Sequence, residues 1–238
     1  MSPAPQLPLA LRYPPDQRFD TFVAAPPGAA EQLRALAQVQ GADWVYLAGP
    51  GGVGKTHLAL AACAAAEAAG RSAAFLPMKS AAGRLRDALD AFDGHALVAL
   101  DGLDAIAGSR DDEVALFDFH NRARQSGSAV LYAASAAPDA LALSLPDLRS
   151  RLSQCTRVVL APLDDDARRD VLRERAQRRG LVLEDAAIDW LLRRRGRDLA
   201  TLTGLLDVLD RASLAAQRKV TVRFLGEVLE PGSPPSGG

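Results

Sequence analysis

The sequence predicts an α/β fold, a doubly wound parallel sheet of five strands, followed by a small all-helical domain. Short apolar segments alternate with helical segments over the first two thirds of the chain, as in a parallel sheet covered on both faces. From Pro162 onward only helical patterns occur. The Pro-, Ser- and Gly-rich ends predict flexible tails. The expected division is a tail at 1–16, an α/β domain at 17–161, a helical domain at 162–230 and a tail at 231–238.

The composition is that of an ordinary globular protein. Of the 238 residues, 48% are hydrophobic and 24% charged. The net charge is -1, so the chain lacks the overall basicity that is typical of nucleic-acid-binding proteins. No apolar run is long enough to span a bilayer and no charged leader precedes one, so we expect a cytoplasmic protein without a membrane partner. Cys63 and Cys155 stand in apolar contexts, which favours buried reduced thiols over a disulfide or a metal site.

A strand, a glycine-rich loop and a helix follow one another near residue 50. The run Trp44 to Ala48 predicts a buried strand, and the Ala- and Leu-rich run after Thr56 predicts a helix. Between them the spacing G-x-x-x-x-G-K-T is that of a phosphate-binding loop, in which glycines let N–H groups converge on phosphate, lysine adds charge and threonine ligates Mg²⁺. We expect a nucleoside di- or triphosphate with Mg²⁺. The expected binding residues are Gly49, Pro50, Gly51, Gly52, Val53, Gly54, Lys55, Thr56 and His57.

A second apolar run, residues 96–101, ends in an acid. A buried parallel strand of this kind delivers its last side chain to the edge of the sheet where the phosphate loop also opens. Asp101 is therefore predicted to hold Mg²⁺ together with Thr56, with helix capping as the alternative. Gly102 stands where vigorous ATPases of this type have an acid that orients water, and Asp104 comes two residues later. Hydrolysis by the protein itself should be slow.

The remaining elements of the α/β domain carry three polar features. Helices are expected at 29–40, 80–92 and 112–124, the last capped by Ser109 or Asp111, and further strands at 73–77, 129–135 and 156–160. Ser135 ends its strand, where it either senses a γ-phosphate or caps a loop. A short helix beginning at Pro146 presents Arg149 and Arg151. We expect Arg151 on the surface near the carboxyl edge of the sheet.

The tail sequence Gln6-Leu7-Pro8-Leu9-Ala10-Leu11 combines a glutamine with alternating apolar residues. Extended peptides with apolar anchors are a common recognition mode, but six residues alone favour a proline-rich linker. In the helical domain, the arginines at 173–179 and 193–197 are interspersed with acids, which favours a solvated face over a nucleic-acid surface.

The order of these motifs resembles that of AAA+ ATPases, whose P-loop sheet domain is followed by a helical lid. Segments 145–152, 207–213 and 217–219 are similar to the ATPase domain of the bacterial initiator DnaA and, more closely, to the DnaA-homologous Hda family of regulatory inactivators. The similarity covers about residues 19–229. It implies an adaptor that binds ADP or ATP with Mg²⁺, docks on the DNA polymerase III sliding clamp, and stimulates hydrolysis of DnaA-bound ATP, so restraining replication initiation.

The resemblance also assigns roles to residues. It implies that Gln6, Leu7, Leu9 and Leu11 form a clamp-binding peptide, which reverses the preference for a linker. It implies that Arg151 is an arginine finger acting in trans, with an intrachain salt bridge as the alternative. By the same resemblance, the protein would contact DNA only through the clamp. The resemblance is also compatible with a homo-oligomer.

Two positions depart from the family pattern. Ala200 stands where AAA+ lids direct an arginine at the nucleotide, and Arg197 lies nearly one helical turn away. Ala10 replaces the proline usual between the last two leucines of the tail motif. The alternative function is a helicase-loader or transposition-helper AAA+ ATPase that binds single-stranded DNA. A P-loop kinase of small metabolites is a further alternative, against which the helical domain and the Arg151 segment count.

Overall fold

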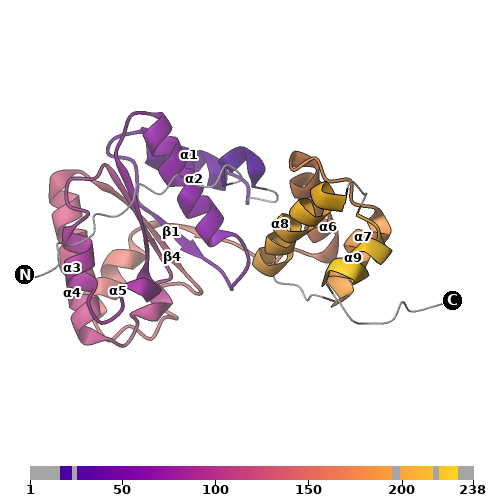
Figure 1. Ribbon diagram of the computed structural model, residues 1–238. Coiled ribbons are helices and arrows are strands. Elements are labelled where there is room, and N and C mark those ends of the chain that lie inside the picture. The colour runs from indigo at the N-terminus through magenta and orange to yellow at the C-terminus, as the bar shows by residue number, and fades with distance from the viewer. Residues whose placement is uncertain (1–16, 23–25, 195–198, 217–219, 230–238) are drawn as a thin grey trace, which may run out of the picture.

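The computed structural model describes residues 17–22, 26–194, 199–216 and 220–229. Figure 1 shows two lobes, the first built on a sheet and the second made of helices α6 to α9. The predicted fold class is confirmed, because the sheet of the first lobe has five parallel strands and a helical lid follows it. The predicted tails lie outside the described residues, and the exact domain boundaries stay a prediction.

The elements agree with the expected order. The first lobe contains η1 (Phe19–Thr21), α1 (Ala29–Gln38), β1 (Val45–Ala48), α2 (Lys55–Ala68), β2 (Ala73–Pro77), η2 (Met78–Ser80), α3 (Leu85–Asp90), β3 (Leu97–Asp101), η3 (Leu103–Ala105), α4 (Arg110–Ser126), β4 (Ala129–Ala134), α5 (Pro146–Ser153) and β5 (Thr156–Val159). The second lobe contains α6 (Asp165–Arg178), α7 (Asp185–Arg194), α8 (Leu199–Ala216) and α9 (Val222–Leu229).

The strand order places two loops at the centre of the sheet. The strands lie in the order β2-β3-β4-β1-β5, with α1 and α2 on one face and α3, α4 and α5 on the other (Figure 1). The connection from β1 leads to β2 at one end of the sheet, whereas the connection from β4 leads to β5 at the other end. The carboxyl ends of the neighbouring strands β1 and β4 therefore flank the point where the direction of the connections changes. Open α/β sheets bind ligands at this point.

The sheet is apolar because helices cover both of its faces. Every residue of β1 and β4 is buried, including Tyr46 and Tyr132, which are among the largest fully buried side chains. Helix α2 is apolar on all sides because it packs between α1 and the sheet. Cys63 and Cys155 are buried free thiols, as predicted.

The helix expected at 80–92 is shorter in the structure, because α3 begins only at Leu85. Gly83 adopts a left-handed conformation with φ 80°. The carboxylate of Asp112, from α4, accepts hydrogen bonds from the backbone N–H groups of Gly83 at 2.7 Å and Leu85 at 3.2 Å. A side chain that is distant in the sequence therefore supplies the cap and fixes where this helix starts.

The start of α4 also differs from the expected capping. Ser109 occupies the N-cap position, but its side chain makes no capping hydrogen bond. The helix begins at Arg110 rather than Asp112. Acids occupy its first turn, where their negative charge interacts favourably with the positive end of the helix dipole. Two of these acids, Asp112 and Glu113, are buried and bind backbone groups of neighbouring segments.

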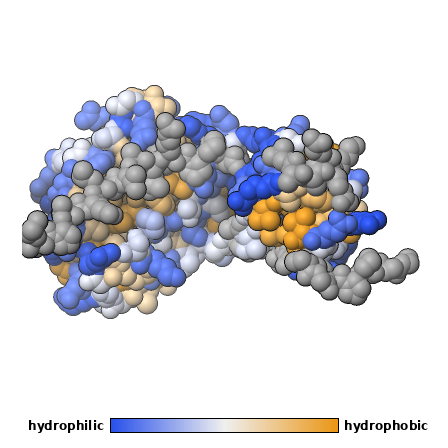
Figure 2. Space-filling view, in the orientation of Figure 1, coloured by the Kyte–Doolittle hydropathy of each residue, from blue (hydrophilic) through white to orange (hydrophobic). Residues whose placement is uncertain are grey.

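The lid has a hydrophobic core of its own. Figure 2 shows apolar surface on this lobe over α8 and α9, and the interior is formed by residues such as Leu172, Ile188, Leu206 and Phe224. Arg169 and Arg173 of α6 pair with acids of α6 and α7. The predicted solvated face is thus confirmed for Arg173, whereas Arg175 and Arg178 contact the first lobe. Along the described part of the chain, no helix is both long and apolar enough to cross a membrane.

Candidate nucleotide site

The predicted phosphate loop connects β1 to α2. Residues 49–54 lie between the end of the strand and the first turn of the helix, as the sequence pattern predicts. Gly54 is the N-cap of α2 with φ 96°, and a Cβ atom there would overlap the ring of Phe22. A Cβ atom on Gly49 would overlap the backbone oxygen of Leu160. Both glycines are therefore required by close packing, and Gly54 also by its left-handed conformation.

The lysine and threonine of the loop face an acid from another strand. The Nζ atom of Lys55 donates to the backbone oxygens of Gly49 at 2.6 Å and Pro50 at 2.7 Å. Burial lowers the pKa of Lys55, against the opposing effect of the Asp101 and Asp104 carboxylates nearby. The hydroxyl of Thr56 donates to Asp101 Oδ2 at 2.6 Å. The fold thus brings these groups together from β3 and from the start of α2.

These residues fit a Mg²⁺-nucleotide. A hydroxyl and a carboxylate in contact supply the oxygen ligands that Mg²⁺ prefers. The amino-terminal end of α2 carries a partial positive charge suited to phosphate, and no acid lies in its first turn. Within the described ranges, no cluster of three or more His, Cys, Asp or Glu side chains forms a separate metal site. The assignment of Thr56 and Asp101 as Mg²⁺ ligands stays a proposal.

Asp104 and Ser135 form a pair at the same edge of the sheet. Gly102 turns the chain in a left-handed conformation after Asp101, and η3 follows. The carboxylate of Asp104 then accepts a hydrogen bond from the backbone N–H of Ser135 at 2.9 Å and another from its hydroxyl. Of the two interpretations of Ser135, this geometry resembles the capping of a loop. Sensing of a γ-phosphate stays a prediction.

The two arginines of α5 have different environments. Arg149 is half-buried, and its guanidinium donates to the backbone oxygen of Leu143, so it anchors the helix to its own chain. Arg151 is exposed and has no ion-pair partner within the described ranges, so the salt-bridge alternative finds no support there. The Cys155 thiol lies 3.9 Å from the backbone oxygen of Arg151.

The expected position of Arg151 near the carboxyl edge of the sheet is wrong. Helix α5 begins close to that edge and runs back toward the start of β5, where Thr156 pairs with Val45 at the opposite edge. Arg151 is in the last turn of this helix, so its guanidinium lies away from the phosphate loop of its own chain.

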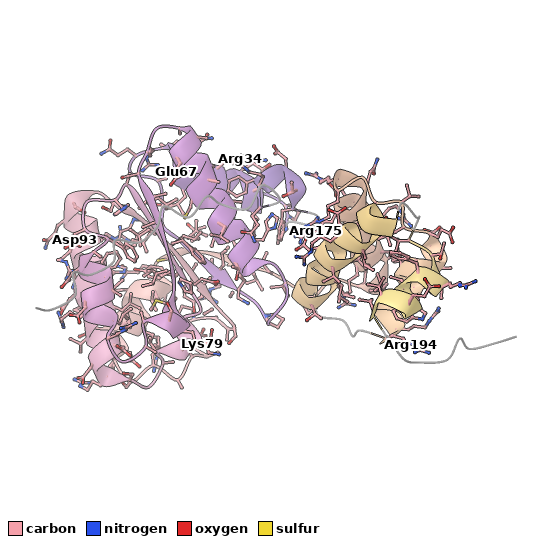
Figure 3. The ribbon with its side chains drawn as sticks, in the orientation of Figure 1. Arg34, Glu67, Lys79, Asp93, Arg175 and Arg194 are labelled. Carbon is pink, nitrogen blue, oxygen red and sulfur yellow. The ribbon has the colours of Figure 1, made fainter. Side chains whose placement is uncertain are left out.

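His57 connects the phosphate-loop helix to the lid. Its Nε2 atom lies 2.9 Å from the backbone oxygen of Arg18. Because a carbonyl oxygen can only accept a hydrogen bond, we assign the ring proton to Nε2. The other ring nitrogen, Nδ1, then accepts from Arg175 Nη2 of α6 at 3.1 Å. Figure 3 labels Arg175 at the junction of the two lobes. Arg178, also of α6, donates to the backbone oxygen of Asp20 at 2.9 Å.

These lid arginines are functional candidates that the sequence reasoning missed. Arg175 and Arg178 stand among other arginines of α6 and have no motif of their own, so no sequence signal distinguishes them. Ala200 stands where AAA+ lids carry an arginine, and only its helical backbone is described, whereas Arg197 lies outside the described residues. Among the described residues, Arg175 of α6 provides a contact between the lid and the phosphate-loop helix.

Two family models match different parts of the chain. A family model described as IstB-like ATP binding protein matches residues 7–132, and a model described as the Hda lid domain matches residues 165–229. The lid match agrees with the predicted resemblance.

The solved structures show the same fold. Domain III of the Thermotoga maritima replication initiation protein DnaA matches with a TM-score of 0.76 at 18% identity, over 92% of this chain and 97% of that one. AMPPCP-bound DnaA from Aquifex aeolicus matches with a TM-score of 0.69 at 21% identity, over 85% of this chain and 67% of that one. The Thermotoga maritima RuvB variant T158V matches with 0.66 at 18% identity, over 92% and 72%. At these identities the likeness shows the AAA+ fold alone.

Proposed function

Since the chain belongs to the IstB-like ATP-binding protein family and carries an Hda lid domain, we propose that it is a negative regulator of replication initiation. In this role it is a nucleotide-bound adaptor that docks on the DNA-loaded sliding clamp and stimulates hydrolysis of ATP bound to DnaA. The observation that carries the proposal is the Hda lid match together with the exposed Arg151 on α5. The protein would work in the cytoplasm with DnaA and the clamp as partners.

The phosphate loop would hold ADP or ATP in this adaptor. Lys55 would contact the β- and γ-phosphates, and Thr56 and Asp101 would hold Mg²⁺, whose charge offsets that of the phosphates. His57 would position the start of α2 through its contacts with the η1 segment and the lid. Thus the nucleotide would be enclosed where the two lobes meet.

Hydrolysis by the protein itself would be slow. Gly102 has no side chain to orient a water molecule, and the Asp104 carboxylate is engaged by Ser135. An adaptor of this kind acts by supplying a group to its partner's site rather than by turning over its own nucleotide.

Arg151 would be that group. A guanidinium placed at another subunit's γ-phosphate stabilises charge that develops in the transition state. Its exposure and its distance from the chain's own phosphate loop, at the far end of α5, support action in trans. The clamp-binding role of Gln6, Leu7, Leu9 and Leu11 lies outside the described residues and is supported by the sequence resemblance.

A second candidate is a helicase-loader or transposition-helper ATPase that binds single-stranded DNA. The IstB-like match over residues 7–132 favours it for the α/β domain, whereas the lid match favours the adaptor. The two functions differ in their partner, because the second requires a direct contact with single-stranded DNA.

Single-turnover hydrolysis of DnaA-bound ATP, with clamp-loaded DNA present, tests the proposal. The parent protein should accelerate hydrolysis, and Arg151→Ala should reduce that acceleration by up to about 10³-fold while keeping nucleotide affinity. Arg157→Ala is the matched control, because Arg157 is also an exposed arginine next to α5. Arg149→Ala is a poorer control, since Arg149 anchors the helix. No acceleration by the parent, combined with tight binding to single-stranded DNA, would favour the second candidate.

A further inference from the structure

Glu113 is a buried carboxylate that binds two separate loops. It lies in the first turn of α4 and is fully inaccessible to solvent. Its Oε1 atom accepts from the backbone N–H of Gly108 at 2.7 Å and of Ser144 at 3.0 Å. Its Oε2 atom accepts from the Ser144 hydroxyl at 2.9 Å and from the backbone N–H of Leu145 at 2.7 Å.

The hydrogen bonds keep this side chain ionised. Burial alone acts to raise the pKa of Glu113, but the hydrogen bonds from Ser144, Gly108 and Leu145 outweigh it and lower the pKa below its usual value. A charged acceptor forms stronger hydrogen bonds than a neutral one, so the two loops are firmly held.

The two loops belong to different parts of the site. Gly108 ends the segment that follows Asp101 and η3, and Leu145 is the N-cap residue of α5. Helix α5 has only eight residues, and its other attachments are the buried Leu148 and Leu152 and the Arg149 contact with Leu143. Glu113 therefore fixes the amino-terminal end of the short helix that carries Arg151 in its last turn.

We propose that Glu113 is a positioning residue for Arg151. By holding Ser144 and Leu145 against the loop at Gly108, it sets the direction of α5 and the place at which the guanidinium meets a partner's nucleotide. This inference rests on the proposed function. Misplacing a reacting group by about 1 Å costs up to about 100-fold in rate, so a loosened α5 would lower the stimulated rate without removing Arg151.

The adjacent acid provides a matched control. Asp112 is also buried in the first turn of α4, and it also accepts two backbone hydrogen bonds, from Gly83 and Leu85. These bonds fix α3 rather than α5. A substitution at either acid removes a buried charge, but only the one at Glu113 releases the helix of Arg151.

The test compares Glu113→Gln, Asp112→Asn and Arg151→Ala in single-turnover hydrolysis of DnaA-bound ATP, with clamp-loaded DNA and increasing amounts of each variant. The glutamine amide accepts through one oxygen only, so it loses half of the acceptor capacity. We expect Glu113→Gln to lower the saturating rate by about 10-fold or more, with little change in the concentration for half-saturation. Asp112→Asn should retain the parent rate. In the Arg151→Ala background, Glu113→Gln should cause no further loss.

Hydrogen exchange of the isolated, full-length variants gives a second readout. The backbone amides of α5 should exchange faster in Glu113→Gln than in the parent and in Asp112→Asn. Equal saturating rates for Glu113→Gln and Asp112→Asn, or a further loss in the Arg151→Ala background, would overturn the inference. If the parent itself does not stimulate hydrolysis, the proposed function fails, and the exchange of α5 then decides alone whether Glu113 positions this helix. Should Glu113→Gln unfold, Ser144→Ala, which removes one of the four bonds, replaces it with the same expected direction.

Discussion

Acid should destabilise the α/β lobe through one buried histidine. His120 of α4 is 1% exposed, and its Nδ1 atom lies 2.9 Å from the hydroxyl of the fully buried Tyr132. Burial, with the nearby positive charges of Arg124 and Arg151, lowers the pKa of His120 from 6.5 to about 4. The folded protein therefore keeps this side chain neutral at a pH where the unfolded chain already binds a proton.

The direction and size of the effect follow from this difference in pKa. Stability is complete above pH 6.5 and is lost as the pH falls toward 4, because protons bind more tightly to the unfolded chain. One pKa unit corresponds to about 1.4 kcal/mol, so the contribution of His120 should fall by about 2 kcal/mol between pH 7.5 and pH 5, and by about 3 kcal/mol in the limit of low pH.

Urea unfolding followed by tryptophan fluorescence measures this loss. Trp44 is a local reporter, since its ring centroid lies 4.6 Å from that of His120. Replacing Trp190 by phenylalanine in every protein removes the signal of the lid. The decrease in unfolding free energy from pH 7.5 to pH 5 should be smaller by about 2 kcal/mol in His120→Gln than in its parent. Equal decreases in the two proteins would refute the reasoning, because carboxylates titrate alike in both.

Three further predictions concern function. Lys55→Ala should weaken binding of fluorescent ADP strongly, since Lys55 supplies the positive side chain of the loop, and unchanged affinity would contradict the assignment. The isolated protein should hydrolyse ATP well below about 1 per second in steady state, because Gly102 offers no group to orient water. Replacing Gln6 and Leu7 by alanine should abolish clamp pull-down at an unchanged melting temperature, and retained pull-down would show that the tail is a linker.

Local patterns were enough to predict most of the fold. The run ending at Asp101 matches the end of β3, and the phosphate-loop spacing matches the connection from β1 to α2. Both features are encoded in neighbouring residues, by apolar runs and by glycines that end them. The prediction of the helix near residue 80 was too long because Asp112, distant in the sequence, supplies the cap that starts α3 at Leu85.

The parts of the site that the sequence did not predict are contacts between distant side chains. Nothing near His57 in the sequence indicates that Arg175 donates to it, since the two residues are 118 positions apart. Likewise, Glu113 appears in the sequence as one of several acids at the start of a helix, and only the fold brings Ser144 and Leu145 to it. A pattern gives the residue types of a site, whereas the tertiary packing decides which of them meet.

The close approach of Gly49 to Leu160 has a consequence for how the chain tolerates mutation. The Leu160 N–H donates to the backbone oxygen of Ala48 at 2.8 Å, and the Leu160 carbonyl oxygen occupies the space that a Cβ atom on Gly49 would need. The partner of Gly49 is thus chiefly a backbone atom, which every amino acid at position 160 supplies. Residue 160 can therefore exchange one apolar side chain for another, while position 49 accepts glycine alone. In a saturation-mutagenesis library selected for nucleotide binding, position 49 should retain only glycine, whereas position 160 should accept several apolar residues.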